Sequence, residues 1–352
     1  MESEVLRMIA QGFSRYGGPE VLTSIGEKDP EPGKGDVIIR MGCTSVNNLD
    51  VIVRSGMGDK GITLPHVPGC DVAGVVEKTG EGTAHLSVGE RVIANTVFGC
   101  GSCGHCNAGE DELCREWKTL GMHTHGSYGE LVRVPSGAVI PAPRQFSIEE
   151  LACFPISLSV AWRSLHTLLN ANEGERILLW GASGNVGIMT LLLSKAMGLR
   201  VIAVTRSESK ARRLKVLGAE LVVGYDGEGI AEAVRETTGG EGIEMVMESS
   251  GATLNESIAA VGEGGRIALF GSSSGTSSEV NVIKAYRKGV RIFGVHNSSR
   301  KELEDALEFV TAEGIKPLIS KIMHIEDAGE AHRIFERKGL FGKIVLRHDW
   351  YG

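Results

Sequence analysis

The feature that most constrains the fold of this chain is a glycine-rich turn near its middle, Trp180-Gly181-Ala182-Ser183-Gly184-Asn185-Val186-Gly187. An apolar run from Arg176 to Trp180 precedes the turn and is typical of a buried parallel strand. The segment 188–198 follows it and predicts a helix with Gly198 at its C-terminal cap. A strand, a glycine turn and a helix in this order are typical of the unit that binds a dinucleotide.

Each glycine of the turn has a separate expected task. Gly181 allows the tight turn, Gly184 lets the backbone approach a pyrophosphate, and Gly187 lets the helix pack closely on the strand. The anion would then lie on the helix N-terminus, where N–H groups are unpaired. The predicted binding residues are Gly181, Ser183, Gly184, Asn185, Val186 and Gly187. Because the chain holds 48 glycines, the glycine trio alone is weak evidence, and the alternative is an ordinary strand–helix turn.

Composition narrows the class of protein. A chain of 352 residues with 42 % hydrophobic and 23 % charged residues is long enough for two globular domains. The net charge of -7 and the lack of a dense basic run argue against nucleic acid as a partner. The acidic start, Met1 to Glu4, is unlike a signal peptide, and no apolar run reaches membrane-spanning length. We therefore expect a cytoplasmic protein with a small-molecule substrate and no membrane partner.

The chain changes character after about residue 150. Short β-rich segments broken by Gly and Pro extend from Leu6 to Val134 and predict an antiparallel β domain such as a partial barrel. From Arg176 to Val295 strands alternate with amphipathic helices, which predicts a doubly wound parallel sheet. The fold class is thus α/β, with a β-rich catalytic domain (1–155), a Rossmann domain (156–295) and a C-terminal return to the first domain (296–352).

Four of the seven cysteines lie in one glycine-rich lobe, 99–115, and form the second strong motif: Cys100, Cys103, Cys106 and Cys114. Paired thiolates at this spacing suit tetrahedral Zn²⁺ and would fill all four coordination positions, so the predicted zinc is structural. Its binding free energy would help to fold the lobe. An iron–sulfur cluster, a disulfide pair or a lobe without metal are the alternatives.

Further motifs across the whole chain complete a resemblance to the medium-chain dehydrogenase/reductase superfamily, the group of zinc alcohol dehydrogenases and quinone reductases. They are Gly17 to Leu22 (GGPEVL), Pro68 to Val76 (PGCDVAGVV), Gly126 to Glu130 (GSYGE) and Gly342 to Leu346 (GKIVL). The resemblance implies a GroES-like domain interrupted by a Rossmann domain. It also implies a homodimer or homotetramer built on the edge strand near Arg291.

At the catalytic metal the sequence departs from the zinc alcohol dehydrogenases it resembles. Asn47 stands where the first Cys ligand is expected, Cys70-Asp71 where His-Glu is expected, and roughly Ile156 where the last ligand is expected. One thiol and one carboxylate cannot supply the three protein ligands of a catalytic zinc. The segment from Val46 to Gly56 instead resembles the VNxxDxxxRxG segment of zinc-independent quinone oxidoreductases and enoyl reductases.

Cofactor choice is predicted at the end of the second parallel strand, where an NAD enzyme would carry Asp or Glu. This chain has Thr205, Arg206 and Ser207 there, with Lys210 one turn into the next helix. Two cations and a hydroxyl would attract the 2′-phosphate of NADP(H), although a solvated helix start is the simpler alternative. By resemblance, Tyr225 lies beside the adenosine. Gly271 and Ser272 follow the fifth strand and are expected to border the nicotinamide ribose.

Without a Lewis acid, reduction of a quinone or an activated C=C bond is the chemistry we expect, since it needs only a hydride, hydrogen-bond donors and a proton. The predicted catalytic donors are Asn47, Lys60 and Tyr128, with the pair His123/His125 as weaker candidates. Asp50 and Arg54 are expected to form a positioning ion pair.

The leading prediction is therefore an NADPH-dependent reductase of quinones or α,β-unsaturated carbonyls that carries one structural zinc. One alternative is a zinc alcohol dehydrogenase with a remodelled ligand set of Cys43, Cys70 and Asp71. The other is a protein that binds NADPH without catalysing a reaction.

Overall fold

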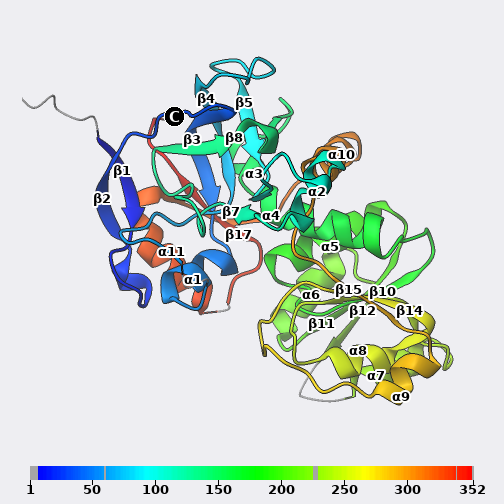
Figure 1. The fold of residues 1–352 in the computed structure, drawn as a ribbon. Coiled ribbons are helices and arrows are strands. Elements are labelled where there is room, and N and C mark those ends of the chain that lie inside the picture. Colours follow the sequence, from blue (N-terminus) through cyan, green and yellow to red (C-terminus); the bar gives the residue numbers. More distant parts are fainter. Residues whose placement is uncertain (1–6, 59–60, 225–228, 338, 351–352) are drawn as a thin grey trace, which may run out of the picture. The chain divides into compact units, whose positions relative to one another are not determined.

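The computed structural model describes residues 7–58, 61–224, 229–337 and 339–350. The chain divides into two compact units (Figure 1). Unit 1 consists of Met1–Ser159 and Asn297–Gly352, and unit 2 of Val160–His296, so unit 2 interrupts unit 1 in the sequence. Among the described residues no helix is both long and apolar enough to cross a membrane.

Unit 2 is built on a parallel sheet whose strand order in the described residues is β12-β11-β10-β13-β14-β15. This is the order 3-2-1-4-5-6 of a doubly wound dinucleotide-binding fold, so the predicted α/β fold class is confirmed. The strands are β10 (Arg176–Leu179), β11 (Arg200–Thr205), β12 (Leu221–Gly224), β13 (Ile243–Glu248), β14 (Val261–Leu269) and β15 (Arg291–Gly294).

Helices cover both faces of this sheet, with α7, α8 and α9 on one face and α5 on the other (Figure 1). Leu178, Val246 and Ile267 on the central strands are fully buried, as expected when a sheet is covered on both faces. The helices that begin within unit 2 are the π-helical segment η4 (Arg163–Leu168), α5 (Asn185–Ala196), α6 (Glu208–Leu217), α7 (Ile230–Thr237), α8 (Leu254–Ala260) and α9 (Val282–Arg287).

Unit 1 contains an antiparallel-rich sheet in which β3 pairs with β4, β8 and β17. The C-terminal strand β17 therefore completes the sheet that the N-terminal half begins. The strands are β1 (Arg7–Gly12), β2 (Thr23–Lys28), β3 (Asp36–Ser45), β4 (Val72–Thr79), β5 (Arg91–Ala94), β6 (Val97–Phe98), β7 (Lys118–Thr119), β8 (Leu131–Pro135), β9 (Val139–Pro141), β16 (Ile319–His324) and β17 (Lys343–Arg347).

Strand β3 shows how the unit 1 core forms. Val37, Ile39 and Met41 alternate along it and belong to one buried cluster, while Ile38 faces the other way and packs with Met8. The helices and 3-10 turns of this unit are η1 (Pro19–Val21), α1 (Asn48–Ser55), α2 (Gly104–Asn107), η2 (Asp111–Leu113), η3 (Ser136–Ala138), α3 (Ile148–Leu151), α4 (Pro155–Trp162, which extends past the boundary at Ser159), α10 (Arg300–Ala312), η5 (Ile325–Asp327) and α11 (Ala328–Glu336).

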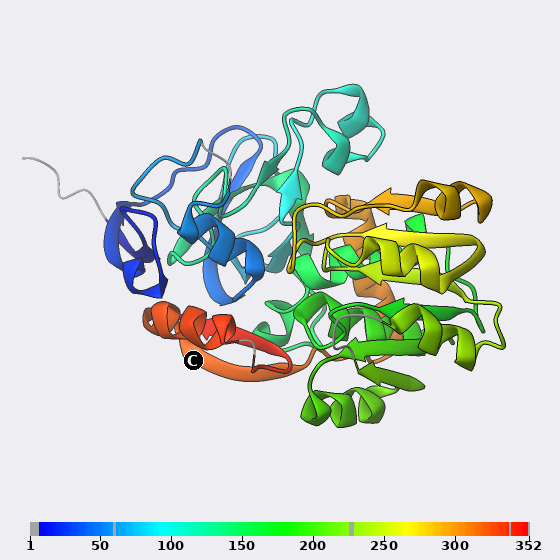
Figure 2. The same cartoon turned by 90° about the horizontal axis from the view of Figure 1, so that it is seen from below.

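The C-terminal helix α11 lies beside the N-terminal segment of the chain (Figures 1 and 2). It packs on the 3-10 turn η1, where Gly329 lies so close that a Cβ would meet the carbonyl oxygen of Pro19 at 3.0 Å. Ala328 and Ala331 are fully buried against the core that contains Phe13 and Val53. Small residues on α11 thus allow the two ends of the chain to pack together.

Candidate functional site

The glycine-rich turn connects β10 to α5 as the sequence predicts. Gly181 has φ +65°, a conformation that side chains rarely adopt, and Gly184 is the N-cap residue of α5. The helix begins at Asn185, so its first N–H groups lie at the turn. This is the arrangement that attracts a phosphate anion.

Close packing is a further reason for glycine at positions 187 and 181 of this turn. A Cβ on Gly187 would come within 2.3 Å of the carbonyl oxygen of Gly181, which no neighbouring backbone shift relieves cheaply. A Cβ on Gly181 itself would come within 2.5 Å of Ser249 Oγ. The turn is therefore tightly packed against the segment that follows β13.

The predicted NADP-selecting residues lie at the end of β11 and the start of α6. Ser207 caps α6, since its Oγ accepts from Lys210 N at 3.4 Å, and Thr205 Oγ1 accepts from Ser207 N at 3.3 Å. The pKa of Lys210 is lowered, first by burial and second by the charge of Arg213. Cations therefore gather beside a helix N-terminus, with Glu208 as the acidic residue of its first turn. Tyr225 lies outside the described residues.

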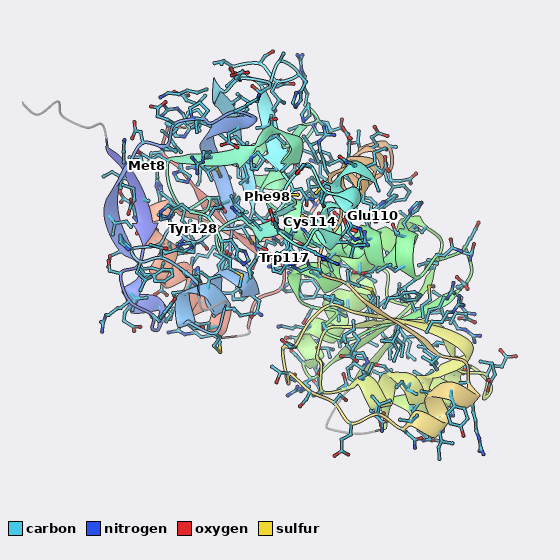
Figure 3. All side chains as sticks on the ribbon, viewed as in Figure 1. Met8, Phe98, Glu110, Cys114, Trp117 and Tyr128 are labelled. Atoms are coloured by element: carbon cyan, nitrogen blue, oxygen red, sulfur yellow. The ribbon has the colours of Figure 1, made fainter. Side chains whose placement is uncertain are left out.

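The four cysteines of the lobe come together as a group. Their sulfur atoms all lie within 4.8 Å of one another, and Cys103 and Cys106 are 3.6 Å apart. A tetrahedral site with Zn–S bonds of about 2.3 Å places its sulfurs about 3.8 Å apart, so the residues fit this ion. The N–H groups of Cys100 and Glu116 each donate to Cys114 Sγ at 3.3 Å, and such donors orient a thiolate toward a metal ion (Figure 3 labels Cys114).

Gly99 is part of the same lobe. A Cβ there would lie 2.4 Å from Cys106 Sγ and 3.0 Å from the Cβ of Cys114, so glycine lets the chain pass beside the sulfurs. Zinc held by these thiolates would organise a segment that contributes few apolar residues to a core.

Asn47, Cys70 and Asp71 stand where zinc alcohol dehydrogenases carry the residues of their catalytic metal site. In the structure a buried ammonium group lies at this corner of unit 1, beside Asp71. Lys343 Nζ donates to Asp71 Oδ2 at 2.6 Å, to Ser45 Oγ at 2.7 Å and to Asn47 Oδ1 at 3.0 Å. The side chains of Lys343 and Asp71 are only 4 % and 0 % exposed. A cation supplied by β17 thus already neutralises the carboxylate.

Neutral donors also engage both oxygens of the Asp71 carboxylate. Ile156 N donates to its Oδ1 at 2.9 Å, Asn47 Nδ2 donates to its Oδ2 at 2.7 Å, and Ser45 Oγ makes a short hydrogen bond to the same oxygen. Asp71 therefore has its oxygens engaged by protein groups, which leaves little capacity for a metal ion.

The alternative ligand set of Cys43, Cys70 and Asp71 does not assemble in the described part of the chain, where the four lobe cysteines form the metal-binding group. Burial raises the pKa of Cys43 and of Cys70 well above the ordinary thiol value, which favours the protonated thiol over the metal-binding thiolate.

Two of the predicted catalytic donors, Asn47 and Tyr128, are buried. Asn47 is 3 % exposed, and its amide spans Asp71 and Lys343. Tyr128 is fully buried, and its hydroxyl lies 2.9 Å from His332 Nε2 (Figure 3). Contacts within unit 1 thus hold both side chains in its interior. Lys60 lies outside the described residues.

The expected ion pair between Asp50 and Arg54 does not form. Arg54 donates to Glu336 on α11 at 2.8 Å and to His332 Nδ1 at 3.2 Å, while Asp50 caps α1 by accepting from Asn47 N at 2.8 Å. Because an arginine can only donate, His332 carries its proton on Nε2 and donates to Tyr128. Burial, followed by the charge of Arg54, lowers the pKa of His332 to about 3, so the ring stays neutral.

His332 and Glu336 were missed by the sequence analysis. They lie on one face of α11, four residues apart, and meet Arg54 and Tyr128 from distant parts of the chain. The amphipathic spacing of α11 shows that one face is buried, but no local signal identifies its partners.

The two candidate histidines both accept backbone hydrogen bonds. His125 Nδ1 accepts from Val67 N at 3.1 Å, and His123 Nδ1 accepts from Thr119 N at 3.0 Å. Acceptance at Nδ1 places the proton of each neutral ring on Nε2. His125 is exposed, whereas His123 is half-buried with its ring edge-on to Trp117.

Comparisons with known proteins agree with this architecture. Residues 33–144 match the alcohol dehydrogenase GroES-like domain family, and residues 185–312 match the zinc-binding dehydrogenase family. An acryloyl-coenzyme A reductase of Metallosphaera sedula is 30 % identical over 91 % of this chain and 94 % of its own length. An alcohol dehydrogenase of Geobacillus stearothermophilus is 29 % identical over 91 % and 94 %.

Among solved structures, an NAD-dependent alcohol dehydrogenase superposes with a TM-score of 0.89, at 36 % identity over 97 % of this chain and 99 % of that one. The chain belongs to the medium-chain dehydrogenase/reductase superfamily of zinc-binding dehydrogenases, whose members include both reductases and alcohol dehydrogenases.

Proposed function

We propose that the protein is an NADPH-dependent reductase of quinones or α,β-unsaturated carbonyl compounds that works without a catalytic zinc. The observation that carries this proposal is the Asp71 corner, where Lys343 occupies the place of a cation at 2.6 Å from the carboxylate. Alcohol oxidation needs a route to the alkoxide, which zinc normally supplies. The relationship to an acryloyl-coenzyme A reductase supports reduction of an activated C=C bond.

The chain's own part in cofactor binding follows from unit 2. The N–H groups at the start of α5 would hold the pyrophosphate, and Gly271 and Ser272 after β14 would border the nicotinamide ribose. When bound, NADPH would supply the hydride for the electron-poor carbon.

The adenosine end would be read by Arg206, Ser207 and Lys210. A carboxylate there would repel a 2′-phosphate, whereas this cluster would attract it. Burial and, second, the charge of nearby Arg213 lower the pKa of Lys210, so like charges lie close together here. Relief of this like-charge repulsion by an anion favours NADPH over NADH.

His125 is the donor that the geometry of unit 1 favours for the oxygen that gains charge during reduction. The backbone N–H of Val67 fixes its Nδ1 as an acceptor, so the exposed ring presents Nε2–H as a donor. Asn47 and Tyr128 would act indirectly, by holding the interior that supports this segment.

The lobe cysteines would hold one zinc ion with a purely structural role, because four thiolates leave no open coordination position. This zinc would stabilise residues 99–115 and take no part in the reaction.

A second candidate, zinc-dependent alcohol dehydrogenase activity, is favoured by the alcohol dehydrogenases among the relatives. A third, NADPH binding without catalysis, requires only unit 2. We further propose a homodimer or homotetramer joined along β15, whose Ile292 is 42 % exposed.

NADPH oxidation measured on quinones, enones, acryloyl-coenzyme A and ketones, with zinc determined on the same sample, separates these functions. We expect turnover of the first three classes and one zinc per chain, in line with the single four-cysteine group of the described residues. Two zinc ions per chain with chelator-sensitive alcohol oxidation would support the alcohol dehydrogenase. Binding of NADPH with no acceptor reduced would support the non-enzymatic function.

A further inference from the structure

A buried carboxylate in unit 2 has no part in the function proposed above. Glu248 ends strand β13 and is fully buried. It accepts from Ser250 N at 2.8 Å, Gly251 N at 3.2 Å, Thr253 Oγ1 at 2.9 Å and Ser257 Oγ at 2.6 Å. Burying a carboxylate is costly unless donors replace its water, and here neutral donors converge on both oxygens.

One of these donors connects Glu248 to the glycine-rich turn. The indole N–H of Trp180 donates to Ser257 Oγ at 2.8 Å. Because an indole N–H can only donate, the Ser257 hydroxyl accepts from Trp180 and donates its own hydrogen bond to Glu248. Trp180 directly precedes Gly181, so the chain of hydrogen bonds ends at the first residue of the turn.

The loop held by Glu248, residues 249–251, also touches the turn directly. Ser249 Oγ donates to the carbonyl oxygen of Trp180 at 2.9 Å. The same Oγ occupies the space that a Cβ on Gly181 would need, at 2.5 Å. A displacement of this loop would therefore also displace the turn that is proposed to bind the pyrophosphate.

On its other side the loop carries the segment that follows β14. Ser273 N donates to Ser249 O at 3.2 Å, and Ser274 N donates to Ser250 O at 2.9 Å. Gly251 has φ +76°, and a Cβ on it would lie 2.2 Å from Gly275 O. The loop is thus packed between the glycine-rich turn and the segment 271–275, and it sets the distance between them.

We propose that Glu248 is a positioning residue for the cofactor: its carboxylate fixes the spacing between the pyrophosphate turn and the segment 271–275 proposed to border the nicotinamide ribose. This inference rests on the proposed NADPH binding. Ordering a loop during binding costs free energy. Because Glu248 orders this loop beforehand, the cost is avoided and the affinity for the whole dinucleotide is higher. The adenosine half, held by the start of α6, does not depend on this spacing.

The test compares Glu248→Gln and Ser257→Ala with the parent protein, using full-length chains. Gln would turn an N–H group toward the donors that Glu248 accepts from. Ala at position 257 would remove one of the four donor residues of Glu248 together with the link to Trp180. The control is Glu244→Gln on the same strand, which removes a carboxylate that pairs with Arg176 at 3.0 Å, away from the turn. Thermal melting of each variant shows whether it is folded.

The readouts are the dissociation constants of NADPH and of adenosine 2′-monophosphate, which lacks the 5′-phosphate, together with the change in tryptophan emission on binding. We expect Glu248→Gln to weaken NADPH about tenfold, which is a coupling of ordinary size. Ser257→Ala should weaken it less, and neither variant should change the binding of adenosine 2′-monophosphate. Glu244→Gln should leave both constants unchanged.

Equal loss of both ligands, or no loss of either in both variants, would overturn the inference, because a general effect on stability does not distinguish the two halves of the cofactor. If Glu248→Gln fails to fold, Ser257→Ala decides by the same criteria. A parent protein that binds no NADPH would overturn the proposed function and the inference with it, whereas parent binding with unaffected variants overturns the inference alone.

Discussion

Removal of the ammonium group from the Asp71 corner should strongly destabilise unit 1. In Lys343→Met the carboxylate of Asp71 stays fully buried but loses its cationic partner at 2.6 Å. Breaking a buried ion pair on one side costs about 3–5 kcal/mol. Asp71 keeps the neutral donors Asn47, Ser45 and Ile156, so we expect a loss near the lower end, about 3 kcal/mol.

The reverse change, Asp71→Asn, leaves the ammonium of Lys343 buried against Ser45 and Asn47 and should cost a similar amount, about 3 kcal/mol. The double variant contains no uncompensated charge. Its loss should therefore be about 3 kcal/mol rather than the roughly 6 kcal/mol expected of independent sites.

Chemical denaturation of the four proteins, followed by circular dichroism, measures these differences. The zinc content of each should stay equal to that of the parent, because the lobe cysteines are untouched. Additive losses in the double variant, or single losses below about 1 kcal/mol, would refute the view that this pair is a coupled buried charge pair. A second zinc bound by the parent and lost in Asp71→Asn would instead point to a metal site at this corner.

The pKa of Asp50 is raised from 3.8 to about 7, and burial is the largest cause. Between these two pH values the folded protein keeps the proton, whereas the unfolded chain has released it. The free energy of unfolding should therefore fall as the pH rises from about 4 to about 7, by on the order of 3 kcal/mol, and denaturation of Asp50→Asn across this range should lack that component. Cys114→Ser should lower zinc per chain toward zero and increase proteolysis of residues 99–115, as measured by metal analysis and limited digestion; retention of zinc would contradict the four-thiolate site. Lys210→Glu should weaken NADPH by at least about tenfold and affect NADH much less in binding titrations, since only NADPH carries the 2′-phosphate; an equal effect on both would contradict the assigned role. Gly187→Ala should abolish NADPH binding, because its Cβ would lie 2.3 Å from Gly181 O; normal affinity would show that the turn has room to adjust.

Several parts of the fold follow from local sequence. The helices α6 (Glu208–Leu217) and α7 (Ile230–Thr237) lie in the region from Arg176 to Val295, where apolar periodicity predicts amphipathic helices between strands. The glycine-rich turn is equally local, since strand, turn and helix are adjacent in the chain. Helix α5, in contrast, begins at Asn185, three residues before the predicted start, because the first turn of the helix forms part of the glycine motif.

The spacing of Cys100, Cys103, Cys106 and Cys114 also predicted their grouping, since paired cysteines two residues apart are typical of a metal site. The absence of the usual metal ligands at Asn47, Cys70 and Asp71 was equally readable from the residue types. The contact between Lys343 and Asp71 was not readable from the sequence, because the two residues are 272 positions apart and meet only when β17 pairs with β3.

Contacts between distant parts of the chain also explain why the predicted ion pair of Asp50 and Arg54 does not form. Asp50 and Arg54 are four residues apart on α1, a spacing that favours an ion pair on an exposed helix. Both are buried here, and tertiary packing brings Glu336 and His332 of α11 to Arg54 while the N-terminal amide of α1 takes Asp50. Short-range patterns thus fixed the elements and the motifs of this protein, whereas the partner of each buried charge depended on which distant strand or helix the topology placed beside it.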